Sequence, residues 1–213
     1  MMASLLLCLL PALLATASAQ EEYITCEQCS ASANTCTAGG TTCRVPKATG
    51  GCITIIDEDT LQGTPTTSFF RGCVTDFDRI LSGPITYSAG GNRNLRINTV
   101  GCRDTDRCNA GSLAVPTVDA QPNGLQCPTC LIFGINTCDG QITHCRGNET
   151  YCIDLSGLTC AGTLTSFAAK GCASASAQYV KVGGILFSAG KIFLLDKAKA
   201  TPAEKIRSSP AWK

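Results

Sequence analysis

The chain has 213 residues, and its 17 basic and 16 acidic side chains nearly cancel, so the charge shows no nucleic-acid footprint. Only 6% of the residues are aromatic, whereas 16 are cysteine. The hydrophobic core is therefore expected to be thin, and disulfides, each adding about 2–4 kcal/mol, must carry much of the stability. The charge is uneven: residues up to Lys170 hold ten Lys/Arg against fourteen Asp/Glu, whereas residues from Lys181 onward hold seven against two.

Residues 1–19 have the pattern of a secretory signal peptide. An apolar stretch at residues 5–15 precedes the small residues Ala17, Ser18 and Ala19, which makes Gln20 the expected mature N-terminus. The stretch is shorter than the roughly 20 residues of a membrane anchor. We therefore predict a secreted, extracellular protein. Setting aside Cys8 leaves fifteen cysteines, and at this density exported cysteines form disulfides rather than zinc sites.

The cysteine spacing repeats along the chain. Each copy opens with Cys-x-x-Cys, and each reaches its sixth cysteine as a Gly-Cys pair, at Gly72-Cys73 and Gly171-Cys172. The repeat predicts two homologous domains, at residues 20–109 and 125–180. Residues 110–124 between them are rich in Ala, Pro, Gly and Ser and are predicted to be a linker.

Short β-branched segments within each unit predict strands. Residues 52–56 and 96–100 alternate in polarity, and turn-forming residues at 62–65 and 88–92 separate such segments, so the predicted class is all-β. Residues 181–213 are expected to form an atypical, basic and partly disordered tail, with an interfacial amphipathic helix as the alternative. Its apolar runs are too short to span a membrane, and its end lacks a glycolipid-anchor signal, so no membrane anchor is expected.

The ladder Cys26-x2-Cys29-x6-Cys36-x6-Cys43 and the ending Cys108-Asn109 resemble the three-finger domain of the lymphocyte antigen 6 and urokinase receptor family. Residues 122–130 and 145–152 are similar to its two-domain subgroup, which contains gamma-type phospholipase A2 inhibitors and their mammalian relatives. The resemblance covers residues 24 to 175. It implies two small disulfide-rich three-finger domains in tandem, with Asn109 hydrogen-bonded back into the cystine knot.

The resemblance also implies the disulfide pairs. They are Cys26–Cys52, Cys29–Cys36, Cys43–Cys73 and Cys102–Cys108 in the first domain, and Cys127–Cys152, Cys130–Cys138 and Cys145–Cys172 in the second. The second domain departs from the family because no cysteine follows Cys172. Its last disulfide and Cys-Asn ending are missing, so its third finger is expected to be incomplete. Cys160 has no expected partner and is the candidate free thiol.

Candidate sites for catalysis are scarce. The single histidine, His144, precedes a cysteine expected to be crosslinked, so no nucleophile and base pair is available, and we expect neither an enzyme nor a cofactor or metal. Asp57, Glu58 and Asp59 are interpreted as a solvated acidic finger tip. Asn148, in the sequence Asn-Glu-Thr, is a candidate glycosylation site. Candidate binding residues on the fingers are Leu61, Pro65, Phe69, Phe70 and Tyr87, although the phenylalanines also suit core packing.

The expected function is inhibition of a secreted phospholipase A2 by protein–protein binding. Preorganised finger loops lose little entropy on binding, and here they would cover the lipid-facing surface of the enzyme. One alternative is an extracellular modulator of a receptor or of cell adhesion that uses the same fold, and another is a splice product whose second domain misfolds. A homo-oligomer is compatible with the sequence, whereas a nucleic-acid partner is not expected.

Overall fold

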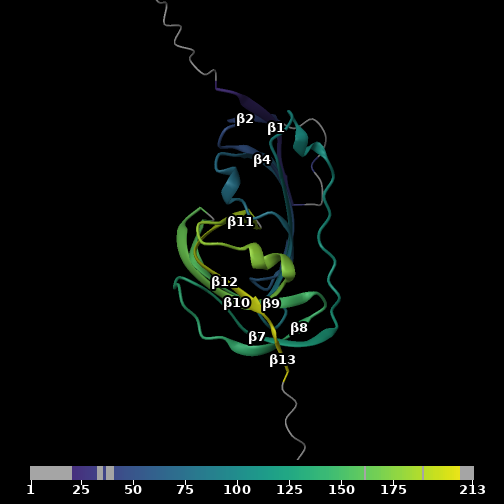
Figure 1. The fold of residues 1–213 in the computed structure, drawn as a ribbon, viewed down its shortest axis with the longest axis vertical. Coiled ribbons are helices and arrows are strands. Elements are labelled where there is room, and N and C mark those ends of the chain that lie inside the picture. The colour runs from purple at the N-terminus through teal and green to yellow at the C-terminus, as the bar shows by residue number, and fades with distance from the viewer. Residues whose placement is uncertain (1–20, 33–35, 37–40, 161, 189, 207–213) are drawn as a thin grey trace, which may run out of the picture.

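The computed structural model describes residues 21–32, 36, 41–160, 162–188 and 190–206 (Figure 1). The predicted signal peptide and residues 207–213 of the predicted tail lie outside these ranges. The all-β prediction is confirmed, because the helices of the described residues are three short 3-10 turns, η1 (Phe77–Arg79), η2 (Cys108–Ala110) and η3 (Ala175–Tyr179). The strands are β1 (Tyr23–Ala31), β2 (Thr41–Pro46), β3 (Gly51–Asp59), β4 (Thr66–Val74), β5 (Gly83–Ser88), β6 (Asn94–Cys102), β7 (Pro122–Phe133), β8 (Gln141–Arg146), β9 (Glu149–Cys160), β10 (Leu164–Ser174), β11 (Ile185–Ser188), β12 (Lys191–Pro202) and β13 (Glu204–Lys205).

The first domain consists of three antiparallel hairpins, or fingers. They are β1–β2, β3–β4 and β5–β6. β3 also pairs with β6, and β1 also pairs with β4, so the fingers form one sheet. The second domain repeats this order with β7–β8, β9–β10 and β11–β12, and β9 pairs with β12 as β3 pairs with β6.

The third finger of the second domain is present, which corrects the expectation of an incomplete finger and a disordered tail for residues 185–202. The physical reason is a strand-like alternation in β12. Phe193 and Leu195 are buried in the core, whereas Ile192 and Leu194 point to the other face of the sheet. The apolar residues that sequence reasoning assigned to a tail therefore form a finger.

The third finger of each domain pairs with the second finger in the same register, β6 with β3 and β12 with β9. Cys102 lies opposite Cys52 in the first domain, and Thr201 lies opposite Cys152 in the second. Thr201 thus occupies the position of the missing half-cystine. The second domain is closed instead by β13, which pairs with β7.

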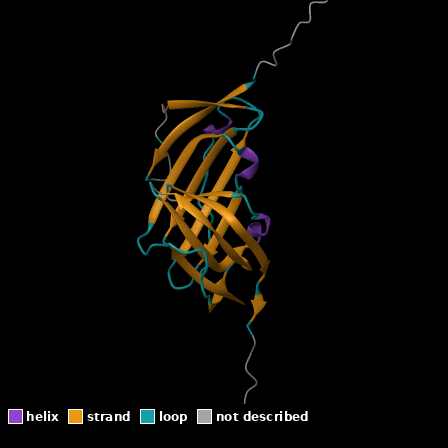
Figure 2. Ribbon diagram, turned by 90° about the vertical axis from the view of Figure 1, so that its left-hand side faces the viewer, coloured by secondary structure: helices purple, strands orange, loops and turns teal. Residues whose placement is uncertain are grey.

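The sheets of the two domains are continuous, because β10 pairs with β5. Figure 2 shows strands along most of the length of the described fold. A β-carbon at Gly171 would lie 2.1 Å from the carbonyl oxygen of Ser88, so this junction requires glycine. Behind it, a single apolar cluster combines residues of both domains, such as Ile55 and Leu95 with Phe167 and Phe193, and encloses a cavity of about 50 Å³. The domains therefore share one core.

Residues 111–121 run along the other face of the first-domain sheet (Figure 1). Side chains of β4 and β6 hold this linker: Arg71 donates to the carbonyl oxygens of Ala110 and Gly111, and Asn98 donates to that of Ala114. The linker therefore shields side chains on that face.

Seven disulfides close the fold, and they are the same seven pairs that the resemblance implies. The cysteines of both Cys-x-x-Cys sequences belong to these bonds, so their sulfurs are not available as zinc-binding thiolates. Cys160 is free and half-buried near the end of β9. A disulfide density of this kind is typical of extracellular proteins.

Candidate functional site

A groove of about 700 Å³ separates the third finger of the first domain from the first finger of the second. One wall is the loop between β5 and β6, where Gly90 and Gly91 adopt the left-handed conformation that glycine tolerates best. A β-carbon at Gly90 would lie 2.8 Å from Thr129 Oγ1, so the loop touches the opposite wall. Glycine at this position therefore allows the two fingers to approach.

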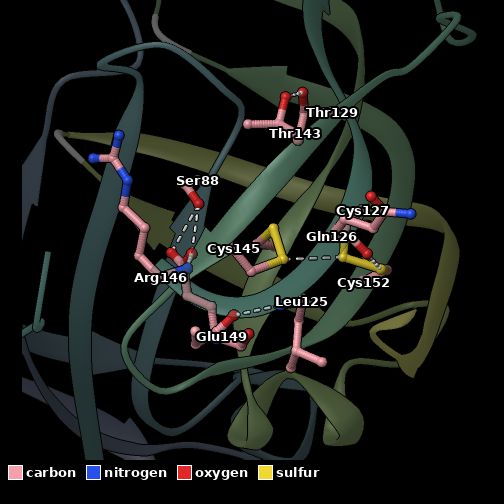
Figure 3. Close-up of a disulfide and its surroundings, with 12 residues drawn as sticks. Ser88, Leu125, Gln126, Cys127, Thr129, Thr143, Cys145, Arg146, Glu149 and Cys152 are labelled. Carbon is pink, nitrogen blue, oxygen red and sulfur yellow. Dashed lines mark hydrogen bonds between the residues drawn. A yellow bond between two sulfur atoms is a disulfide. The ribbon is translucent and has the colours of Figure 1, made fainter. Parts of the chain in front are cut away.

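Hydrogen bonds fix the walls of the groove. The Arg93 guanidinium donates to the carbonyl oxygens of Ala89 and Leu131, both at 3.3 Å, and so links the two domains. The hydroxyl groups of Thr129 and Thr143 lie 2.7 Å apart and join β7 to β8 (Figure 3). The groove is thus a preformed surface between two rigid fingers.

Apolar side chains border the same groove. Ile132 and Ile135 line it, and Ile135 is 50% exposed although it is a large aliphatic residue. Asp139 is the acidic group in the lining. Exposed aliphatic side chains beside a rigid polar cleft suit binding to another protein surface.

A buried carboxylate holds the two domains together near this groove. The Ser88 hydroxyl donates to both carboxylate oxygens of Glu149 at 2.8 Å, and the backbone N–H of Arg146 donates to the same group at 3.1 Å (Figure 3). Burial raises the pKa of Glu149, and the hydrogen bonds oppose that rise. Glu149 therefore fixes the angle between the second domain and β5.

Tyr87 is a second link between the domains. Its hydroxyl donates to the carbonyl oxygens of Lys170 at 3.1 Å and Cys130 at 3.4 Å. The side chain is 5% exposed, and burial raises the pKa of its phenol. Tyr87 therefore supports the groove from inside and cannot contact a partner directly.

Three of the five expected binding residues are thus wrong as surface anchors. Leu61 and Tyr87 are buried in the shared core, and Phe69 is 2% exposed. Phe70 is half-buried against the shared core, and only Pro65 is exposed at its finger tip. The aromatic residues near the cysteines pack in the interior, because the fold has few other large side chains.

The expectation of a solvated acidic finger tip at Asp57, Glu58 and Asp59 is also wrong for both aspartates. Asp57 and Asp59 are buried rather than solvated. The Ser68 hydroxyl donates to Asp57, and the Leu61 N–H donates to Asp59 at 2.6 Å. Burial raises the pKa of Asp59. These carboxylates stabilise the second finger from within.

Asn109 lies where the resemblance implies. Its side chain accepts from the Glu27 N–H at 2.9 Å and donates to the carbonyl oxygens of Glu27 and Ile53 at 2.9 and 3.1 Å. Asn148 is exposed in the turn between β8 and β9, and His144 is exposed on β8.

Sequence reasoning missed the exposed aliphatic residues of the second domain. A signal was present, because residues 131–135 form an apolar run directly after Cys130 that is too long for a buried alternation. The aliphatic residues of this domain that are at least one-third exposed are Ile132, Ile135, Ile142, Leu158, Leu164, Val182, Ile192 and Ile206.

Two tandem three-finger domains with a groove between them define a class of small, disulfide-closed scaffolds that present loops and strand edges. The u-PAR/Ly-6 domain model matches residues 22–111 and 123–188, and the chain therefore belongs to this family. Among the described residues, no helix is long and apolar enough to cross a bilayer.

Relatives with these domains include a receptor and inhibitors. The urokinase plasminogen activator surface receptor of Bos taurus is 30% identical over 74% of this chain, and the matched part spans about half (47%) of the receptor. A phospholipase A2 inhibitor of the gamma type from Laticauda semifasciata is 28% identical over 71% of this chain and 82% of its own length. The crystal structure of mouse TEX101 has 18% identity and a TM-score of 0.36, and the match covers 87% of this chain and all of that one.

Proposed function

We propose that this protein is a secreted, non-enzymatic inhibitor of a secreted phospholipase A2. The exposed isoleucines beside the interdomain groove carry the proposal. A phospholipase that works at lipid surfaces presents an apolar face to its substrate. Ile132 and Ile135 match that face in polarity, and binding there would deny the enzyme its lipid. The relatives named as phospholipase A2 inhibitors support the same partner.

The rigid groove favours tight binding. Its walls are held by Arg93 and by the disulfide Cys130–Cys138, so little conformational freedom remains to be lost when a partner docks. The inhibitor needs no catalytic group, because covering the enzyme surface is sufficient.

A matched pair of variants tests the proposal. Ile135→Glu places a charge beside the groove, whereas Val100→Glu changes a side chain of similar exposure, 48% against 50%, on β6 of the first domain. Binding to purified secreted phospholipases is measured by titration calorimetry without lipid, and inhibition is measured on phospholipid micelles. We expect Ile135→Glu to weaken binding by at least about tenfold, because central apolar contacts dominate interfaces. Val100→Glu should retain wild-type affinity.

No binding by the wild-type protein to any secreted isoform would contradict the proposal, as would equal losses from both variants. The second candidate function is modulation of a receptor, which the similarity to the bovine receptor supports. A receptor modulator would bind a cell-surface protein through the same groove, and Ile135→Glu would again weaken that binding.

We also propose that Asn148 carries an N-linked glycan. It is exposed in a turn after Gly147 and has an intact acceptor sequence, and its Oδ1 accepts from Thr86 at 3.4 Å, which leaves the amide nitrogen available. Treatment of the secreted protein with an N-glycosidase should lower its mass, and Asn148→Gln should abolish that shift.

A further inference from the structure

The outer face of the second-domain sheet has an exposed apolar end. Leu164 and Ile192 both lie opposite Cys160, on β10 and β12, and Leu158 precedes Cys160 by two residues on β9. Cross-strand partners and residues two apart lie on the same side of a sheet, so these side chains form one surface. Leu164 is 62% exposed, and Leu158 and Ile192 are each more than one-third exposed.

Lysines follow on the same face. After the irregularity between Leu195 and Lys197, Lys197 lies opposite Ser156 and Lys199 lies opposite Asp154. Lys170 lies opposite Asp154 from the other side, on β10. The acidic groups nearby are Asp154, which pairs with Lys197 at 2.8 Å, and Asp196, which accepts from Ser156 at 2.7 Å. Glu204 lines a cavity together with Lys170 and Lys199.

The charge of this region is opposite to that of the rest of the chain. β12 holds three lysines and one aspartate, whereas residues up to Lys170 have four more acidic than basic side chains. Such an asymmetry orients a molecule at a charged surface, with β12 directed toward negative charge.

We propose that this face, defined by Leu158, Leu164, Ile192, Lys170, Lys197 and Lys199, docks on an anionic phospholipid surface. The apolar end enters the boundary between headgroups and acyl chains, and the lysines lie level with the lipid phosphates. A second copy of the chain fits this face less well, because a twofold contact over the whole face would enclose the lysines of both copies and remove them from water. The face is distinct from Ile135 and the groove proposed to bind an enzyme.

Co-sedimentation with vesicles tests the proposal. We expect the full-length protein to bind phosphatidylcholine vesicles that contain about 30% phosphatidylserine, and binding should fall when salt is raised to about 1 M. Leu164→Glu should reduce the partition coefficient at least tenfold, and Ile192→Ser should reduce it several-fold. Lys199→Gln should reduce it about fivefold. Val100→Glu and Ile135→Glu should bind as the wild type does.

Absence of binding to the anionic vesicles, or binding that Leu164→Glu leaves unchanged, would overturn the proposal. So would a dimer, detected by light scattering, that Leu164→Glu converts to monomer, because the face would then belong to a second copy. The lipid-free calorimetry above separates the two proposals: Leu164→Glu should leave enzyme binding intact, and Ile135→Glu should leave vesicle binding intact.

Discussion

The two domains have the same arrangement of fingers but are closed in different ways. In the first, the disulfide Cys102–Cys108 and the side chain of Asn109 tie the end of the third finger to the knot. In the second, the corresponding position is Thr201, and the backbone of β13 pairs with β7 instead. Finger register therefore depends on strand pairing and core burial, and the closing bond can be replaced by another element.

The largest expected loss comes from the side-chain tie of the first domain. Asn109→Ala removes three hydrogen bonds, one buried and two half-buried, so we expect a loss of about 3–4 kcal/mol in the free energy of unfolding. Asn98→Ala, which removes one exposed hydrogen bond to the linker, is the control and should cost less than about 1 kcal/mol. Urea unfolding measures both. Equal losses would show that Asn109 does not close the domain.

The two Gly-Cys pairs differ in what surrounds the glycine. A β-carbon at Gly171 would meet the backbone of Ser88, whereas one at Gly72 would meet the ring of Phe70, which can move. We expect Gly171→Ala to cost about 2–3 kcal/mol and Gly72→Ala about 1 kcal/mol. Thermal unfolding checks the order. A larger loss at Gly72 would mean that the continuous sheet across β5 and β10 contributes little.

The elements that close the two domains differ in how much they are expected to stabilise the fold. Replacing Cys102 and Cys108 together by alanine opens a loop with a sequence separation of 6, and such a short loop predicts a loss of about 2 kcal/mol. Ile206→Pro removes the N–H that donates to the Gly124 carbonyl at 3.0 Å in the second domain, and should cost about 1 kcal/mol. Denaturant unfolding of each variant gives the difference. A greater loss from Ile206→Pro would show that the backbone closure of the second domain stabilises the fold more than the closing disulfide of the first.

Much of this fold follows from the cysteine ladder, because its spacing and repeat indicate two finger domains and the resemblance implies each pair. The third finger of the second domain was missed, since its cysteine is replaced by Thr201 and only the alternation around Phe193 identifies it. The groove could not be predicted from local patterns, because it exists only where the Gly90 loop meets Thr129 across the domains. Burial of Phe69 likewise depends on pairing between distant strands, because β4 lies between β1 and β3 and Arg71 lies over the Phe69 ring.

The smallest expected effect concerns the carboxylate that joins the domains. Burial raises the pKa of Glu149 above its usual value of 4.5, so its contribution to stability is fully present below pH 4.5 and is lost as the pH rises through the raised pKa. Glu149→Gln has no such titration and can keep an acceptor for Ser88. We therefore expect the free energy of unfolding of the variant to rise relative to that of the wild type, by less than about 1 kcal/mol, as the pH rises from about 4 to 7. Asp59 titrates in both proteins and cancels in the difference, which urea unfolding across this range would measure. A difference independent of pH would show that folding leaves the pKa of Glu149 unchanged.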